Sequence, residues 1–147
     1  MKTRTLLLSA IISSVVTCFS YAESLNVDFH AIETIESHGN PHAYNRRSGA
    51  VGLYQITPVV LKEYNAVKKT RLTMRNLYRA ETNRAVATWY LTERIPQMLR
   101  HFHKPLNVET LLTCYNAGVG YVVHGWALPK ETKDYIVKYK KLTRRAI

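Results

Sequence analysis

Apolar residues recur at helical spacing along most of this chain, and proline or glycine interrupts the pattern at short intervals. In the first such stretch, Val27, Ala31 and Ile35 fall on one face of a helix over about 26–36. The segment 42–52 has no strong strand pattern and contains enough turn residues for a loop or a minimal hairpin. We therefore predict a mainly α fold of several short helices with little or no sheet.

Caps and breakers predict where the later helices begin and end. Thr57 offers a hydroxyl cap and Pro58 suits the first position of a short helix that ends near Tyr64. Asn107 caps another helix, and Gly118 ends it. The remaining helices are expected over 81–95, 96–103 and from about 129 or 131 onward.

The longest of these predicted helices, over 81–95, is followed directly by Pro96. Proline lacks a backbone N–H and its ring clashes with the preceding turn, so Pro96 is expected to break or kink the helix. The inner face of the same helix is expected to carry Ala85, Thr88, Trp89 and Leu91.

Residues 1–22 have the pattern of a secretory signal peptide. Lys2 and Arg4 precede an uncharged apolar run over 6–19, and a small-x-small cleavage site ends at Ala22. The apolar run is too short to span a membrane. We therefore predict an exported protein, periplasmic or secreted, in which 23–147 form one domain with a short basic C-terminal tail; lipidation at Cys18 stays open.

The chain is strongly basic, with a formal charge of +11, and only Lys2 and Arg4 fall in the predicted signal. This charge favours acidic surfaces such as cell-wall polymer or anionic lipid, and export makes nucleic acid an unexpected partner. After residue 22 the single cysteine is Cys114, so no intrachain disulfide is expected and core packing must supply the stability. We expect a monomer.

Glu36 is the candidate catalytic residue. Cleavage of a glycosidic bond needs a carboxylic acid that stays protonated near neutral pH, which requires burial. Glu36 lies at the C-terminal end of the first predicted helix, where the helix dipole disfavours a carboxylate. No Asp or Glu occurs between Glu36 and Glu63, which favours a mechanism with one carboxylate, although folding can bring Glu131 or Asp134 close. The alternative is an ordinary solvated glutamate.

Five motifs in order give the chain a recognisable pattern. They are Ala31-Ile32-x-x-x-Glu36-Ser37 with Asn40-Pro41, then Gly49-Ala50-x-Gly52-Leu53-x-Gln55-Ile56-Thr57-Pro58, then Asn83 with Trp89-Tyr90-Leu91, then Tyr115-Asn116-Ala117-Gly118, and finally Pro129-x-Glu131-Thr132-x-x-Tyr135. In these motifs the chain resembles the soluble-lytic (SLT) type of lytic transglycosylase, which has a lysozyme-like fold.

The resemblance implies a definite reaction on peptidoglycan glycan strands. The β-1,4 bond between N-acetylmuramic acid and N-acetylglucosamine is cleaved without water, and Glu36 acts first as acid and then as base. The C6 hydroxyl of the muramic acid attacks its own C1 and leaves a 1,6-anhydro end. The resemblance implies no metal and no cofactor.

By position, the resemblance also assigns substrate-binding roles to Ser37, Gln55, Tyr115, Asn116 and Tyr135. Tyr135 matches the tyrosine whose hydroxyl approaches the catalytic glutamate. The chain departs from the family at Tyr54, where methionine is usual, so Tyr54 is expected to alter the shape of the substrate site.

Two other functions stay open from the sequence. A hydrolytic muramidase would cut the same bond with the same acid but use water as the nucleophile. A basic wall-binding module without activity would hold the polymer by charge alone. The short length further suggests service to a secretion, conjugation or pilus apparatus that crosses the cell envelope.

Overall fold

The computed structural model describes residues 25–144; the predicted signal peptide and the last three residues of the tail lie outside the described residues. The helices are α1 (Phe29–Ser37), α2 (Pro58–Lys68), α3 (Ala80–Trp89), α4 (Ile95–His101), α5 (Val108–Ala117), α6 (Val119–His124) and α7 (Lys130–Arg144), with a 3-10 segment, η1 (Met74–Tyr78), and a π-helical turn, η2 (Tyr90–Arg94). The prediction of a mainly α fold is confirmed.

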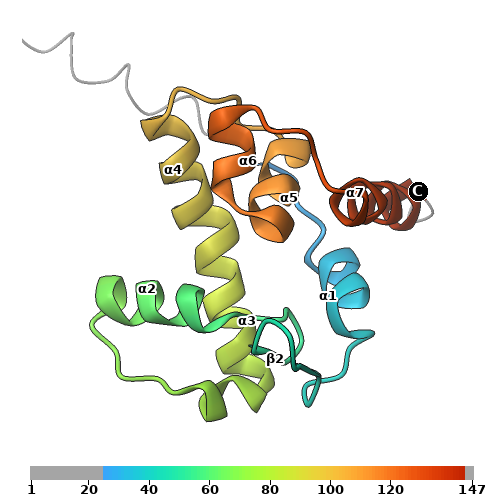
Figure 1. Cartoon of the computed structure of the whole chain (residues 1–147). Helices are drawn as coiled ribbons and strands as arrows, with labels where there is room; N and C mark the ends of the chain where they lie inside the picture. The colour runs from blue at the N-terminus through green and yellow to red at the C-terminus, as the bar shows by residue number, and fades with distance from the viewer. Residues whose placement is uncertain (1–24, 145–147) are drawn as a thin grey trace, which may run out of the picture.

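A long rod made of α3, η2 and α4 runs through the fold, and α2, α5 and α6 pack along it (Figure 1). α2 contacts the α3 end, whereas α5 and α6 contact the α4 end. α7 packs on both α1 and α5, which brings the two ends of the described chain together. The helix that carries Glu36 is therefore held by the last helix of the chain.

A minimal hairpin provides the strands of the described region. β1 (Tyr44–Asn45) and β2 (Ala50–Val51) are antiparallel, with Tyr44 opposite Val51 and Asn45 opposite Ala50. This agrees with the expectation of little or no sheet. The hairpin projects from the loop that follows α1 and leads back to the start of α2.

Side-chain caps set the first helix boundaries. α1 begins at Phe29, later than expected, because the Asp28 carboxylate accepts the Ala31 N–H at 2.9 Å and so caps the helix. The Asp28 N–H in turn donates to the Tyr139 hydroxyl on α7 at 2.8 Å. The expected caps at Thr57 and Asn107 are confirmed, and α2 continues past Tyr64 as far as Lys68.

The predicted break or kink at Pro96 takes the form of a π-helical turn: regular α-helix stops at Trp89 and resumes at Ile95, just before the proline. In η2 the N–H of Ile95 donates to the Tyr90 carbonyl, five residues back, which widens the helix and leaves room for the Pro96 ring. Pro96 is buried and the rod continues through it (Figure 1).

The π turn also keeps one apolar face in register. The buried residues Ala87, Leu91, Ile95 and Leu99 recur every four residues, a spacing that drifts around a regular helix of 3.6 residues per turn. The π-helical turn contains one residue more than an α-helical turn, so the four side chains stay on one face of the rod. The expected inner face was therefore partly wrong: Trp89 and Leu91 are buried, but Ala85 and Thr88 are exposed.

The core fills the space between the rod, α1, α5 and α7. Cys114 on α5 is 1% exposed and packs as a small apolar residue, as expected. α6 was not anticipated: Gly118 ends α5, and the next helix begins one residue later. None of the helices in the described part of the chain is both long and apolar enough to cross a membrane.

Candidate active site

The structure contains a cleft of about 810 Å³. Its walls are formed by the end of α1, the hairpin, the start of α2, the end of α5 and the first half of α7. Its lining includes Glu36, Gln55, Tyr115, Asn116, Glu131 and Tyr135. Five of the seven candidate site residues from the sequence, together with Glu131, thus line one hollow although they are distributed over most of the chain.

Glu36 has the environment that a general acid needs. It sits on the last turn of α1, partly buried, and the structure gives it no ion-pair partner among the described residues. Burial raises its pKa from 4.5 to about 7, the nearby Tyr135 hydroxyl lowers it, and the negative charge of Glu131 raises it. The carboxyl group is therefore about half protonated near neutral pH.

Tyr135 on α7 faces Glu36 from across the cleft. Its hydroxyl is buried and has no formed hydrogen bond within the described residues, yet it lies close enough to Glu36 to lower the carboxyl pKa. Burial and the neighbouring glutamate raise the pKa of the Tyr135 hydroxyl, so it stays protonated. It is available as a hydrogen-bond donor to a carboxylate or to a ligand in the cleft.

Tyr115 and Asn116 line the cleft from the end of α5, and each carries a polar group. The Tyr115 hydroxyl donates to the Tyr54 carbonyl at 2.6 Å, which fixes the ring beside Glu36. The Asn116 side-chain oxygen accepts the Thr132 hydroxyl at 2.8 Å. Since that bond uses the amide oxygen, the two amide N–H donors of Asn116 remain for a ligand.

The loop after the hairpin is fixed by two amide side chains. Gln55, at φ +48, donates to the carbonyls of Gly52 and Ala43 and so braces the loop that it belongs to. The buried Asn83 accepts the Tyr54 N–H and donates to the carbonyls of Val51 and Leu77. This wall of the cleft is therefore tied to α3 by backbone-directed hydrogen bonds.

Gly52 allows the loop to approach Asn83 closely. A Cβ atom on Gly52 would lie 2.3 Å from the Asn83 amide nitrogen and 2.6 Å from the Leu77 carbonyl oxygen, and its φ is +79°. Only glycine fits this position without displacing the loop.

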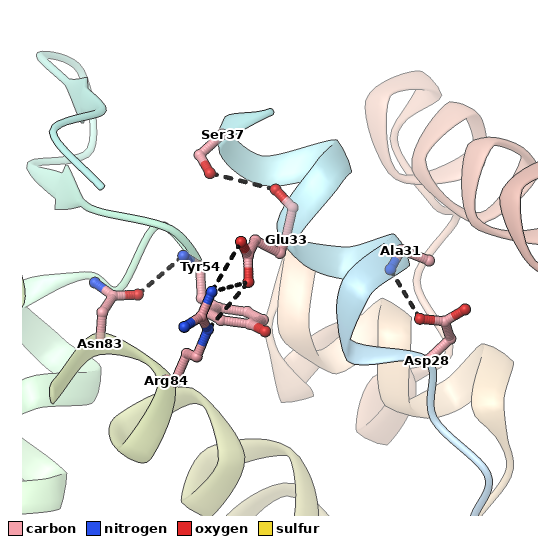
Figure 2. A network of polar contacts seen from close by, with 7 residues as sticks. All are labelled: Asp28, Ala31, Glu33, Ser37, Tyr54, Asn83 and Arg84. Atoms are coloured by element: carbon pink, nitrogen blue, oxygen red, sulfur yellow. Dashed lines mark hydrogen bonds and ion pairs between the residues drawn. The ribbon is translucent and has the colours of Figure 1, made fainter. Parts of the chain in front are cut away.

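Tyr54 and Ser37 are not among the residues that line the cleft. Figure 2 shows the side chains of both near Glu33. The Tyr54 ring lies beside the ion pair between Glu33 and Arg84, and burial together with Glu33 raises the pKa of its hydroxyl to about 12. The Ser37 hydroxyl donates to the Glu33 carbonyl at 3.3 Å and so stabilises the helix end. Their predicted contact with substrate stays a prediction.

The Transglycosylase SLT domain family matches residues 22–137, most of the chain. The chain belongs to this family. It is a lytic transglycosylase domain with a mainly α, lysozyme-like fold, and its substrate is peptidoglycan. No curated protein and no solved structure is significantly similar to the chain.

The cleft is also lined by residues to which the sequence analysis assigned no role in the site. Arg47 and Ser48 reach the cleft from the tip of the hairpin, Lys138 reaches it from α7, and Tyr90 lines it from the π-helical turn. Only the three-dimensional arrangement brings these segments to one hollow. The basic composition was the single sequence signal that pointed to a cationic rim.

Within 25–144, no group of three or more His, Cys, Asp or Glu side chains is arranged to hold a metal ion. The carboxyl groups that line the cleft are those of Glu36 and Glu131.

Proposed function

We propose that Glu36 is the single catalytic acid and base of a non-hydrolytic cleavage of the β-1,4 bond between N-acetylmuramic acid and N-acetylglucosamine. The observation that carries this proposal is the position of its carboxyl group, which lies in the cleft with a pKa of about 7. A group with that pKa can both donate and accept a proton near neutral pH.

In the first step the protonated Glu36 gives its proton to the glycosidic oxygen while the bond from that oxygen to C1 breaks. The leaving sugar departs as an alcohol, and the muramic acid becomes oxocarbenium-like at C1. Glu36 is then a carboxylate. The Tyr135 hydroxyl, which lowers the pKa of this carboxyl group, stabilises the charged form at this stage.

In the second step the Glu36 carboxylate takes the proton from the C6 hydroxyl of the muramic acid. The C6 oxygen attacks C1 and closes the 1,6-anhydro ring, and the carboxylic acid is restored. No water enters the product. The amide donors of Asn116 and the ring of Tyr115 hold the sugar in this wall of the cleft.

The cationic rim supports an anionic polymer as the substrate. Arg47 on the hairpin and Lys138 on α7 are exposed and flank the same cleft from two sides. Peptidoglycan carries carboxylates on its peptide stems. The two cations attract these groups toward the cleft.

Glu131 favours a second candidate, a hydrolytic muramidase. It is a second carboxylate in the cleft, and the ordinary hydrolytic scheme uses two. In that scheme Glu131 would activate a water, whereas in the proposed scheme it acts on Glu36 through its charge.

Mass spectrometry of the fragments released from purified peptidoglycan separates the two reactions. The proposed reaction gives muropeptides lighter by one water than the hydrolytic products. Glu36→Gln should release no fragments, whereas Glu33→Gln, one helical turn away, should release the same anhydro products as the parent. Hydrated products from the parent, or activity in Glu36→Gln, would contradict the proposal.

We further propose that the chain acts outside the cytoplasm after cleavage behind Ala22, where its polymer substrate lies, and that it serves an envelope-spanning apparatus. N-terminal sequencing of the protein recovered from the cell envelope tests the cleavage position. A start at Glu23 is expected, and retention of Met1 would contradict it.

A further inference from the structure

An exposed aromatic cluster lies at the end of α6. Trp126 is 55% exposed and stacks on His124, with ring centres 4.7 Å apart and 21° between the planes. Tyr121 meets the same indole in a T-shaped contact at 5.5 Å. A large aromatic ring held at the surface by two other rings is typical of a binding surface.

The Trp126 ring is held in one orientation. Gly125 ends α6 with φ +66°, and the Trp126 N–H donates to the Tyr121 carbonyl at 3.2 Å, which is the hydrogen bond of a Schellman cap. The contact with Tyr121 is the apolar contact that accompanies such a cap. It leaves more than half of Trp126 open to solvent, and a ring already fixed loses little conformational entropy when a ligand covers it.

The cluster is connected to the wall of the cleft through the start of α6. Gly118, at the junction of α5 and α6, lines the cleft. A Cβ atom placed on Gly120 would lie 3.3 Å from Cζ3 of Trp126, so the indole edge rests on the first turn of α6. Gly120 follows Gly118 by two residues along the chain.

We propose that Trp126, supported by His124 and Tyr121, is a further sugar-binding subsite for the glycan strand as it leaves the cleft. This inference rests on the proposed function, since a polymeric glycan must continue over the surface next to the cleft. The apolar C–H face of a pyranose ring stacks on an indole, and its hydroxyl groups reach the indole N–H and the solvent at the rim.

The test measures binding of β-1,4-linked N-acetylglucosamine oligomers of two lengths to the Glu36→Gln protein, which removes turnover. Trp126→Leu keeps an apolar contact on Gly120 and Tyr121 but removes the stacking face. We expect it to weaken binding of the long oligomer about tenfold and to leave binding of the short one within about twofold. Trp126→Phe should be intermediate. Phe102→Leu, at another surface aromatic that is 43% exposed, should change neither.

Tryptophan fluorescence gives an independent readout. Trp89 is 4% exposed, so the solvent-sensitive emission comes from Trp126, and the long oligomer should shift it to shorter wavelength. Equal loss for both lengths in Trp126→Leu and Trp126→Phe would mean a merely structural role and would overturn the inference, as would unchanged binding. These outcomes are separate from the product analysis, which tests the reaction and not the length dependence.

Discussion

Two glutamates one turn apart on α1 lie in opposite electrostatic environments. Glu33 faces α3, where the Arg84 guanidinium contacts both carboxylate oxygens at 3.2–3.3 Å beside the ring of Tyr54 (Figure 2). Glu36 faces the cleft, where Tyr135 is its neutral neighbour and Glu131 adds charge of the same sign.

Position on the helix does not account for the contrast between the two carboxyl groups. Both residues have the same chemistry and nearly the same place along α1, so the packing partners decide. α3 supplies Glu33 with an ion-pair partner, Arg84, whereas none of the ion pairs within the described residues involves Glu36. Burial, with no such partner to offset it, is therefore what raises the pKa of Glu36.

The largest expected effect is on the rate of cleavage. Glu36→Gln should reduce the turnover of peptidoglycan roughly a thousandfold, because the amide can neither give nor take the proton. Glu33→Gln should keep the rate within about threefold. The measurement is the release of soluble muropeptides per unit time, and equal losses in the two variants would remove the contrast between the glutamates.

The second effect is on stability and depends on pH. The pKa of Glu36 is raised from 4.5 to about 7 in the folded protein, so between those values the unfolded chain releases the proton first. The free energy of unfolding should fall as the pH rises through this window, by about 3 kcal/mol in total at about 1.4 kcal/mol per unit. Glu36→Gln should remove most of this fall, so the inactive variant should be the more stable one at pH 8. Urea unfolding at pH 4.5 and pH 8 measures the difference, and parallel curves for parent and variant would contradict it.

The third prediction distinguishes Tyr135 from Glu131, because they shift the pKa of Glu36 in opposite directions. Removing the Tyr135 hydroxyl in Tyr135→Phe should raise the pKa of Glu36 further, and removing the charge in Glu131→Gln should lower it. Because the free enzyme needs the protonated acid, the alkaline limb of the kcat/KM profile should move to higher pH in the first variant and to lower pH in the second. An alkaline limb that moves in neither variant would mean that burial alone sets the pKa.

The smallest effect is expected from loss of the ion pair between Glu33 and Arg84. Arg84→Met removes the guanidinium from a pair in which Arg84 is 53% exposed and Glu33 12% exposed. The free energy of unfolding should fall by at most about 1 kcal/mol, and less in high salt, with activity unchanged. A large loss of activity would show that the two sides of α1 are coupled.

The helical class, the helix caps and the grouping of Glu36 with distant residues could be predicted from the sequence. Thr57, Pro58 and Asn107 give local signals that any chain of this kind obeys, and the ordered motifs identify the family together with its site. Tyr135 is therefore expected beside Glu36, and Tyr115 is expected to face the substrate sugars.

The parts that could not be predicted depend on tertiary packing. The direction of the Tyr54 ring follows from its contact with Glu33 and Arg84, which come from two different helices. The approach of Glu131 to Glu36 depends on how α7 docks on α1. The hairpin tip at Arg47 and the ring of Trp126 have no periodic pattern that would mark them.

The π-helical turn determines which way the two halves of the rod face relative to each other. If the same residues formed a regular α-helix without the wide turn, the side chains after it would rotate by about 100° around the axis relative to those before it. Leu99 would then point away from the core that Ala87 and Leu91 face. The wide turn thus accommodates the extra residue and keeps both halves of the rod facing the same interior.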